Sequence, residues 1–356
     1  MGPFAKRRKI WYKNPDDVVG APNVKGEPVF SETDRMKLQE RIGRIHLQQR
    51  LGIQADHVSH VFGRGRNLFH PENWYSLPQL MRSLLRVVGL YGRGRRNAVN
   101  LQIRHNEVDL PQLPAAFNGF TILQLSDLHL DMLPLLVEVL KERLEEVQYD
   151  VCVMTGDFRA WTFGAYEACV AAVQQIRPHL RGPVYAVLGN HDFIEMVPPL
   201  EALEISFLLN EHAEIRRDGV SIYLAGIDDP HYYQVDNMEK ALSGIPRGAV
   251  CVLLAHSPEV YKLAAHGDVD LLLCGHTHGG QMCLPGGVAP YFNVHGPRRI
   301  CDGAWRHHRL QGYTSRGVGS AIVDVRFNCA PEITLHHLRL PPPHVGLPPS
   351  PEISGP

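Results

Sequence analysis

The sequence has no long apolar run, and this absence excludes one class of protein. Its longest apolar stretches are the length of a single strand, whereas a helix that crosses a bilayer needs about 20 apolar residues. The basic cluster Lys6–Lys9 is not followed by an apolar segment, because Lys13, Asn14, Pro15 and Asp16 come shortly after it, so a secretory signal is not expected. The sequence therefore favours a protein without a transmembrane helix.

Paired cysteine motifs are also missing. The seven cysteines are an odd number, no two of them form a Cys-x-x-Cys pair, and Cys152, Cys251 and Cys274 fall inside runs with the pattern of core strands. Reduced, scattered thiols of this kind are typical of a reducing compartment. We therefore expect free cysteines and a cytoplasmic protein.

The chain has almost no net charge, at −1 for 356 residues. This balance conceals an asymmetry, because residues 1–110 hold 19 Lys and Arg against 10 Asp and Glu, and the remainder holds 17 against 27. A hydrophobic content of 44% and a charged content of 21% are ordinary for a globular protein. The sequence predicts one large acidic α/β domain that carries a basic N-terminal extension.

Five polar motifs lie at or just beyond the ends of five apolar runs. A parallel strand that is buried on both faces is a continuous apolar run, and ligands of open α/β sheets collect beyond the carboxyl ends of such strands. The runs have this character at 120–125, 151–154, 184–188, 250–254 and 269–273. The motifs are Asp127-Leu128-His129, Gly156-Asp157, Gly189-Asn190-His191-Asp192, His256 and Cys274-Gly275-His276-Thr277-His278-Gly279-Gly280.

The residue types in these motifs suit a pair of divalent metal ions. Imidazoles, carboxylates and one amide carbonyl form a set of nitrogen and oxygen ligands that favours Mn, Fe or Zn, whereas a structural zinc site would be rich in thiolates. A site for two metal ions also needs a bridging carboxylate. Asp127 and Asp157 are the two candidates for that bridge.

The motif set Asp-x-His, Gly-Asp, Gly-Asn-His-Asp, His and Gly-His-Thr-His resembles the calcineurin-like metallophosphoesterases over roughly residues 119–340. The resemblance implies a four-layer α/β/β/α sandwich and the hydrolysis of a phosphoester bond by metal-activated hydroxide. It also implies that Asp157 bridges two metal ions. One ion would be held by Asp127, His129, Asp157 and His278, and the other by Asp157, Asn190, His256 and His276.

The same resemblance implies that His191 is not a metal ligand. It would face the substrate, where it stabilises phosphoryl oxygens or donates a proton to the leaving oxygen, and Asp192 would orient its ring. An ordinary pKa of about 6.5 suits a histidine to this proton transfer. Many relatives have an acidic or amide residue shortly after the second motif, where this chain has Arg159. We interpret Arg159 as a surface arginine, with contact to a substrate phosphate as the alternative. Asp228-Asp229-Pro230-His231 is interpreted as a turn, with a place at the border of the active site as the alternative.

A closer likeness involves residues 275–281, 313–319 and 325–333. It resembles a bacterial branch that includes membrane-associated phosphodiesterases and proteins similar to UDP-2,3-diacylglucosamine pyrophosphatase. It implies that the bond cleaved is a phosphodiester, phosphomonoester or pyrophosphate, with a lipid-linked substrate such as UDP-2,3-diacylglucosamine. The alternatives are a soluble phosphodiesterase that acts on nucleotides and a non-catalytic scaffold. The complete ligand set favours catalysis.

The N-terminal extension contains a basic amphipathic segment at 77–91. One helical arc holds the apolar residues Leu77, Leu80, Met81, Leu84, Leu85, Val87, Val88 and Tyr91, and arginines continue to Arg104. The first interpretation is that the apolar arc packs on the catalytic domain. The alternative is that residues 77–104 bind an anionic membrane surface, which would make the protein peripheral on the inner face of the membrane. A nucleic-acid patch ranks lower, because few aromatic residues accompany the arginines.

The chain is predicted to consist of an extension at 1–118, a catalytic domain at 119–340 and a disordered proline-rich tail at 341–356. In the extension we expect a helix from Ser31 or Thr33 to Leu51 and a linker at 97–118. Helices between the strands are predicted at 135–147, 165–176, 196–208, 238–242 and 259–265, and further strands at 222–226, 320–327 and 332–340.

Overall fold

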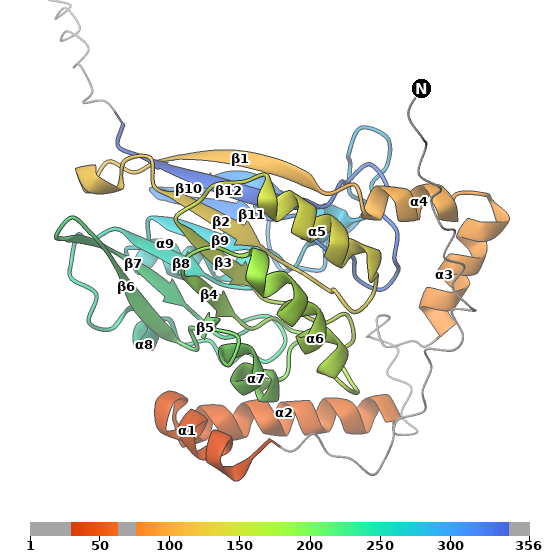
Figure 1. Cartoon of the computed structure of the whole chain (residues 1–356), viewed down its shortest axis with the longest axis horizontal. Helices are drawn as coiled ribbons and strands as arrows, with labels where there is room; N and C mark the ends of the chain where they lie inside the picture. The colour runs from red at the N-terminus through yellow and green to blue at the C-terminus, as the bar shows by residue number, and fades with distance from the viewer. Residues whose placement is uncertain (1–29, 63–75, 342–356) are drawn as a thin grey trace, which may run out of the picture.

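The computed structural model describes residues 30–62 and 76–341, in which two six-stranded sheets pack face to face between layers of helices (Figure 1). The predicted tail therefore lies outside the described residues, apart from Pro341. The first sheet has the order β1-β12-β2-β3-β4-β5 and the second has the order β10-β11-β9-β8-β7-β6. The four-layer α/β/β/α sandwich is thus confirmed.

The strands of the first sheet are β1 (Gln102–Asp109), β2 (Thr121–Leu125), β3 (Val151–Thr155), β4 (Val184–Val187), β5 (Ser206–Phe207) and β12 (Glu332–Arg339). Those of the second are β6 (Glu211–Arg217), β7 (Val220–Gly226), β8 (Cys251–Leu254), β9 (Leu271–Cys274), β10 (Gly303–His307) and β11 (Leu310–Thr314). The helices are α1 (Glu32–Ile42), α2 (Arg44–Phe62), α3 (Ser76–Val87), α4 (Tyr91–Ala98), α5 (Leu135–Glu145), α6 (Glu167–Ile176), α7 (Val197–Glu201), α8 (Met238–Leu242) and α9 (Tyr261–His266).

The alternation of side chains along each central strand builds the layers, because successive residues point to opposite faces of a sheet. In β3, Cys152 and Met154 pack in the core beneath α5 and α6, whereas Val151 and Val153 pack between the two sheets. In β8, the residues with even numbers face the first sheet and those with odd numbers face α8 and α9. A strand buried on both faces must be apolar throughout, which is why these runs could be recognised in the sequence.

Strands β2, β3 and β4 run parallel to one another, as do β7, β8 and β9. Within each set the carboxyl ends therefore lie at one edge. The connecting helices α5 and α6 cover the first sheet (Figure 1). The polar motifs that follow these strands therefore lie together at the carboxyl ends of the strands.

Several sequence-based elements differ from the structure. The predicted linker at 97–118 is wrong, because β1 lies within it and pairs with β12 at the edge of the first sheet. The predicted helix at 196–208 ends at Glu201 and is followed by β5, and the expected strand at 320–327 makes only a single bridge, between Met282 and Phe327. These elements depend on partners far away in the sequence, and local periodicity does not encode such partners.

The described part of the N-terminal extension, residues 30–62 and 76–118, contains the four helices α1 to α4 rather than one helix and one amphipathic segment. Gly43, with a φ of 94°, separates α1 from α2, and Gly89, with a φ of 71°, separates α3 from α4. None of the helices in residues 30–62 and 76–341 is long and apolar enough to span a bilayer. All seven cysteines are free thiols, as expected.

Candidate functional site

The five polar motifs meet in one buried cluster between the two sheets' strand ends. Three overlapping groups of possible metal ligands form there, and within each group the ligand atoms lie within 4.8 Å of one another. The first consists of Asp127, His129 and His278, and the second of Asp157, His256 and His276. A third group, of His129, Asp157 and His191, joins the first two at the rim. The Asn190 side-chain oxygen lies 2.9 Å from Nε2 of His256. The structure therefore brings together all seven residues that the sequence nominated as metal ligands.

Asp157 occupies the centre of this cluster. Its Oδ2 atom lies 3.3 Å from Nε2 of His256 and 3.7 Å from Nε2 of His129, so it faces ligands of both groups. Asp127 lies to one side, with Oδ1 at 3.5 Å from Nε2 of His278. Between the two candidates for a bridging carboxylate, the geometry favours Asp157.

Five of the seven residues have a left-handed backbone conformation, which is uncommon for residues other than glycine. The φ angles are 48° at Asp127, 40° at His129, 57° at Asp157, 70° at His276 and 51° at His278. Each such residue costs on the order of 1–3 kcal/mol, and strained residues gather at functional sites where the surrounding structure holds them. These strained residues lie in the sharp turns that follow β2, β3 and β9.

Glycines make these turns possible by allowing backbone and side chain to approach closely. A Cβ atom at Gly189 would collide with the Asp157 carboxylate, and one at Gly275 would collide with the side chains of Ser126 and Asp127. Glycine is thus required at two of the motif positions for a steric reason. The glycines that flank the histidines in the sequence are part of the packing of the site.

Three of the histidines have one ring nitrogen fixed by a backbone carbonyl. Because a carbonyl can only accept, that nitrogen carries the proton, and in the neutral ring the other nitrogen presents its lone pair. The pairs are Nδ1 of His129 with Arg159 at 2.7 Å, Nδ1 of His256 with Thr155 at 2.8 Å, and Nε2 of His276 with Asn293 at 2.7 Å. The lone pairs therefore point toward the cluster.

The nitrogens that converge on the cluster lie at hydrogen-bond distance from one another. Nε2 of His129 is 3.3 Å from Nε2 of His278, and Nδ1 of His276 is 3.2 Å from Nε2 of His256. Each pair needs one proton, or a cation in its place, because two bare lone pairs at such distances would repel. The buried carboxylates of Asp127 and Asp157 also repel each other. This donor set therefore fits divalent cations.

Burial and neighbouring charges set the pKa values in the cluster. Burial lowers the pKa of His129 to about 3 and that of His276 well below its ordinary value, so both rings are neutral and able to bind metal. Burial also opposes charge on His256, but the Asp157 carboxylate outweighs it and raises the pKa of His256 to about 10. A cation at this position would take the place of that proton.

His191 lies at the rim of the cluster rather than inside it. Its Nε2 is 3.8 Å from Oδ2 of Asp157, and its side chain keeps 14% of its surface exposed, whereas that of His129 keeps none. Its Nδ1 donates to the Ala160 carbonyl at 2.8 Å, so Nε2 is directed at the site. This placement suits a group that meets substrate.

The expectation that Asp192 orients the His191 ring is not met, because the Ala160 carbonyl holds that nitrogen. The Asp192 carboxylate instead accepts three backbone N–H groups, from Asp157 at 2.7 Å, Phe158 at 2.8 Å and Gly189 at 2.8 Å. With these bonds it ties the turn after β3 to the turn after β4. Asp192 therefore positions the backbone of two motifs rather than one side chain.

The interpretation of Arg159 as a surface residue is wrong, since its side chain is completely buried. The guanidinium lies 4.4 Å above the Phe193 ring and donates to the Phe163 and Gly164 carbonyls. Burial lowers the pKa of Arg159. An arginine in a loop gives no local signal of burial, so sequence reasoning could not find this.

His231, in the segment interpreted from the sequence as a turn, lies beside the site, which was the alternative for that segment. Its ring centroid lies 4.2 Å from that of His276, and its Nδ1 is 3.2 Å from the Glu259 carboxylate. Burial opposes the charge on His231, but Glu259 outweighs it and raises the pKa of His231. The available signal was its position after β7, because a polar group follows the other ligand-bearing strands in the same way.

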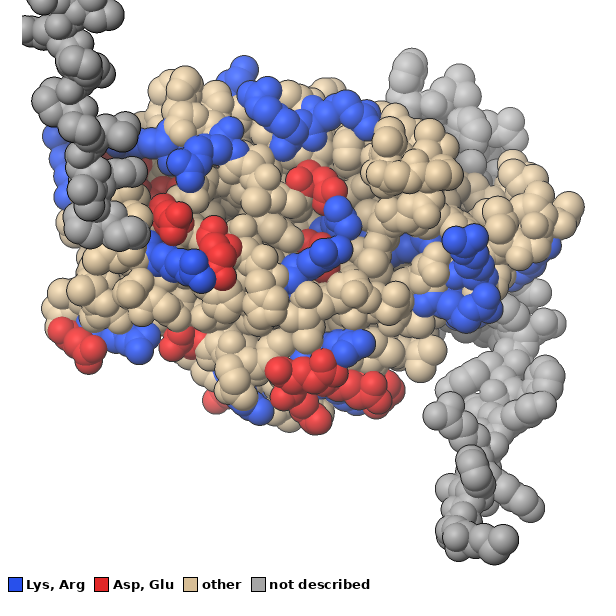
Figure 2. Space-filling view, turned by 90° about the horizontal axis from the view of Figure 1, so that it is seen from above, with Lys and Arg blue, Asp and Glu red and all other residues tan. Residues whose placement is uncertain are grey.

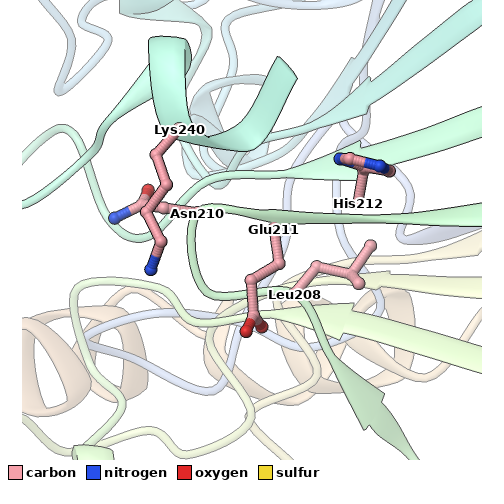
Figure 3. Close-up of a pocket in the computed structure, with 5 residues that line it drawn as sticks. All are labelled: Leu208, Asn210, Glu211, His212 and Lys240. Atoms are coloured by element: carbon pink, nitrogen blue, oxygen red, sulfur yellow. The ribbon is translucent and has the colours of Figure 1, made fainter. Parts of the chain in front are cut away.

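A separate shallow hollow lies on the surface between β6 and α8 (Figure 3), and none of the seven candidate ligands lines it. Its polar groups already have partners in the protein. The Glu211 carboxylate accepts from Arg41 at 2.9 Å, Lys240 donates to the Ile42 carbonyl at 3.3 Å, and His212 bonds to the Ala241 carbonyl at 3.0 Å. The hollow therefore lies along the contact of α1 with β6 and α8.

Comparisons with known proteins identify the family of this chain. A family model described as calcineurin-like phosphoesterase matches residues 120–280, which contain all seven candidate ligands and His191. The chain is 28% identical over 269 residues to the uncharacterized metallophosphoesterase YkoQ of Bacillus subtilis, covering 72% of this chain and 97% of that protein. It is 30% identical over 244 residues to the uncharacterized metallophosphoesterase YkuE of the same organism, covering 64% and 82%. It is 28% identical over 234 residues to the phosphodiesterase YaeI of Escherichia coli, covering 62% and 82%.

Proposed function

This chain belongs to the calcineurin-like phosphoesterase family and is a metal-dependent hydrolase of phosphoester bonds, and from that premise we propose that its activity depends on two divalent cations that share Asp157. The observation that carries the proposal is the position of Asp157 between two groups of ligand atoms. The scissile bond would be a phosphodiester, phosphomonoester or pyrophosphate. A phosphodiesterase relative supports the first of these.

Each residue of the cluster has a role in this proposal. Divalent cations held there would neutralise charge on the phosphoryl oxygens and activate a water molecule for attack. Asp127, His129, Asp157 and His278 would hold one cation, and Asp157, Asn190, His256 and His276 the other. Nitrogen and oxygen ligands of this kind suit Mn, Fe or Zn.

His191 would act on the substrate itself. With Nδ1 fixed by the Ala160 carbonyl, its Nε2 faces the site and can give a proton to the departing oxygen or donate a hydrogen bond to the phosphoryl group. His231, which packs against the ring of His276, borders the same space. The buried Asp192 keeps the turn that carries His191 in register with the turn that carries Asp157.

Removal of metal should abolish this activity. We expect purified protein to hydrolyse bis-p-nitrophenyl phosphate or p-nitrophenyl phosphate with added Mn²⁺, to lose turnover after dialysis against a chelator, and to regain it when Mn²⁺ is restored. Release of p-nitrophenolate measures the rate, and circular dichroism checks that the chelated protein stays folded. A folded, metal-loaded preparation that is inert on every phosphoester class tested would favour the scaffold alternative.

For the physiological substrate we propose a lipid-linked pyrophosphate or phosphodiester, of which UDP-2,3-diacylglucosamine is an example. Support comes from α3, because part of its apolar face is exposed while Met81 and Leu85 are half-buried. Leu80 is 64% exposed, Leu84 61% and Val87 84%. A contiguous exposed apolar face on a basic helix is typical of binding to an anionic membrane interface.

The arrangement of α3 and α4 supports this proposal further. Lys and Arg side chains gather at the end of the molecule that carries these helices (Figure 2, right). Asp324 anchors both helices, because Nε of Arg82 and Nε of Arg95 each lie 3.0 Å from its carboxylate. The neighbouring Arg326 contacts Nδ1 of His278 at 3.2 Å, so the exposed helices adjoin the cluster that holds the candidate ligands.

A charged residue on the apolar face of α3 should weaken membrane binding. Burial of a leucine side chain is worth about 1.5–3 kcal/mol, so Leu84→Asp should reduce binding to phosphatidylglycerol vesicles by about tenfold or more. Cosedimentation measures the binding, and Leu263→Asp, at a half-exposed leucine of α9, is the matched control. Absence of wild-type binding, together with full turnover of soluble nucleotides, would favour the soluble phosphodiesterase.

A further inference from the structure

Helix α2 of the N-terminal extension packs on the turn that carries two of the candidate site residues. Three of its side chains, spaced four residues apart, lie on one face of the helix: His46, Arg50 and Gln54. Arg50 and Gln54 are buried, and α2 lies outside the residues that the family model matches. This contact joins a segment outside the matched residues to the turn that carries Asn190 and His191.

Arg50 is fully buried at the centre of the contact. Its Nη2 donates to the Asp192 carbonyl at 2.8 Å and to the Gly189 carbonyl at 3.3 Å, and its Nη1 donates to the Asp228 carboxylate. The guanidinium also lies 3.8 Å above the ring of Tyr233. One planar cation therefore holds both ends of the turn in which Asn190 and His191 lie.

The neighbouring side chains of α2 complete this support. Gln54 accepts the N–H of Ile194 at 2.9 Å and donates to Glu195 at 2.7 Å, which extends the contact along the chain after the turn. Nε2 of His46 lies 2.7 Å from the second oxygen of Asp228. Asp228 thereby holds Nη1 of Arg50 while the two turn carbonyls hold Nη2.

We infer that Arg50 is a positioning residue of the active site, through which the N-terminal extension sets the geometry of Asn190 and His191. This inference rests on the proposed function. The carbonyls of Gly189 and Asp192 flank the two side chains, so a shift of either carbonyl tilts the amide of Asn190 away from His256 and the ring of His191 away from Asp157. Groups behind metal ligands typically change metal affinity or activity by about 10–100-fold.

A purely structural role makes a different prediction. If Arg50 served only as the buried counter-charge of Asp228, lysine would replace it, because an ammonium group can also pair with a carboxylate. Lysine lacks the planar fork needed to bond Asp228 and two carbonyls together. The variant Arg50→Lys therefore separates the two roles, and Arg41→Lys is the matched control, because Arg41 anchors α1 to Glu201 and Glu211 without touching the turn.

The experiment measures kcat, KM, the Mn²⁺ concentration for half-maximal activity and the melting temperature of the full chain. For Arg50→Lys we expect kcat to fall or the required Mn²⁺ to rise by about 10–100-fold, with assays run well below its melting temperature. Arg41→Lys should lower the melting temperature at most. An active wild type with an unaltered Arg50→Lys would overturn the inference, and so would equal kinetic losses in both variants. An inactive wild type would instead refute the proposed function.

Discussion

Replacing Asp157 with asparagine should reduce phosphoesterase turnover by about 10³-fold or more and should lower the amount of bound metal. An amide offers one neutral oxygen, whereas the carboxylate presents two charged oxygens, and Oδ2 faces ligands of both groups. Loss of a shared cation removes several kcal/mol of charge stabilisation in the transition state, and each 1.4 kcal/mol is worth a factor of ten. Turnover of bis-p-nitrophenyl phosphate and elemental analysis after dialysis measure the two effects.

The matched control for this variant is Asp218→Asn, at an exposed turn residue that also has a positive φ, of 50°. It should leave turnover and metal content unchanged. Because Asp157 is buried among histidines, its neutral variant must also be checked for folding by its melting temperature. A folded Asp157→Asn protein with wild-type turnover and metal content would show that Asp157 is not the shared ligand.

The second large effect is expected for His191→Gln, which should lower kcat by about 10²–10⁴-fold, as is typical for loss of a general acid. Bound metal should be unchanged, because His191 lies at the rim with its side chain 14% exposed and its Nε2 directed at the site. Glutamine can still bond to the Ala160 carbonyl, so the loss measures proton transfer rather than folding. Stopped-flow or steady-state assays at saturating Mn²⁺ give kcat.

Comparison with His179→Gln, a partly exposed residue paired with Glu145, tests whether the effect is specific. A substrate with a better leaving group needs less help from an acid, so the deficit should shrink for p-nitrophenyl esters compared with alkyl esters. A deficit that is equal for both leaving groups and accompanied by metal loss would make His191 a ligand instead. A protein that only recruits partners would be indifferent to the change in every binding assay.

Elements with a local pattern could be predicted from the sequence, whereas elements that depend on distant partners could not. The core strands β2, β3, β4, β8 and β9 were predicted because each is mostly apolar and is followed by polar residues. Strand β1 was missed because its residues are mostly polar and half-exposed, and only its pairing with β12, more than 200 residues away, makes it a strand. The exposure of α3 was also unexpected, because an amphipathic pattern indicates an apolar face but not what covers it.

The residues of the sequence by themselves determined the chemistry of the site: the seven candidate ligands and the order in which they follow the strands. This was possible because strand burial and the turn that follows each strand are encoded locally, whereas the layered fold and the bridging position of Asp157 were implied by the resemblance to a known family. Only the tertiary structure decided that Ala160 rather than Asp192 holds the ring of His191, and that Arg50 supports the Gly189–Asp192 turn from a position 142 residues before Asp192. These contacts join side chains to backbone carbonyls. Because every residue has a backbone carbonyl, no sequence pattern predicts such contacts.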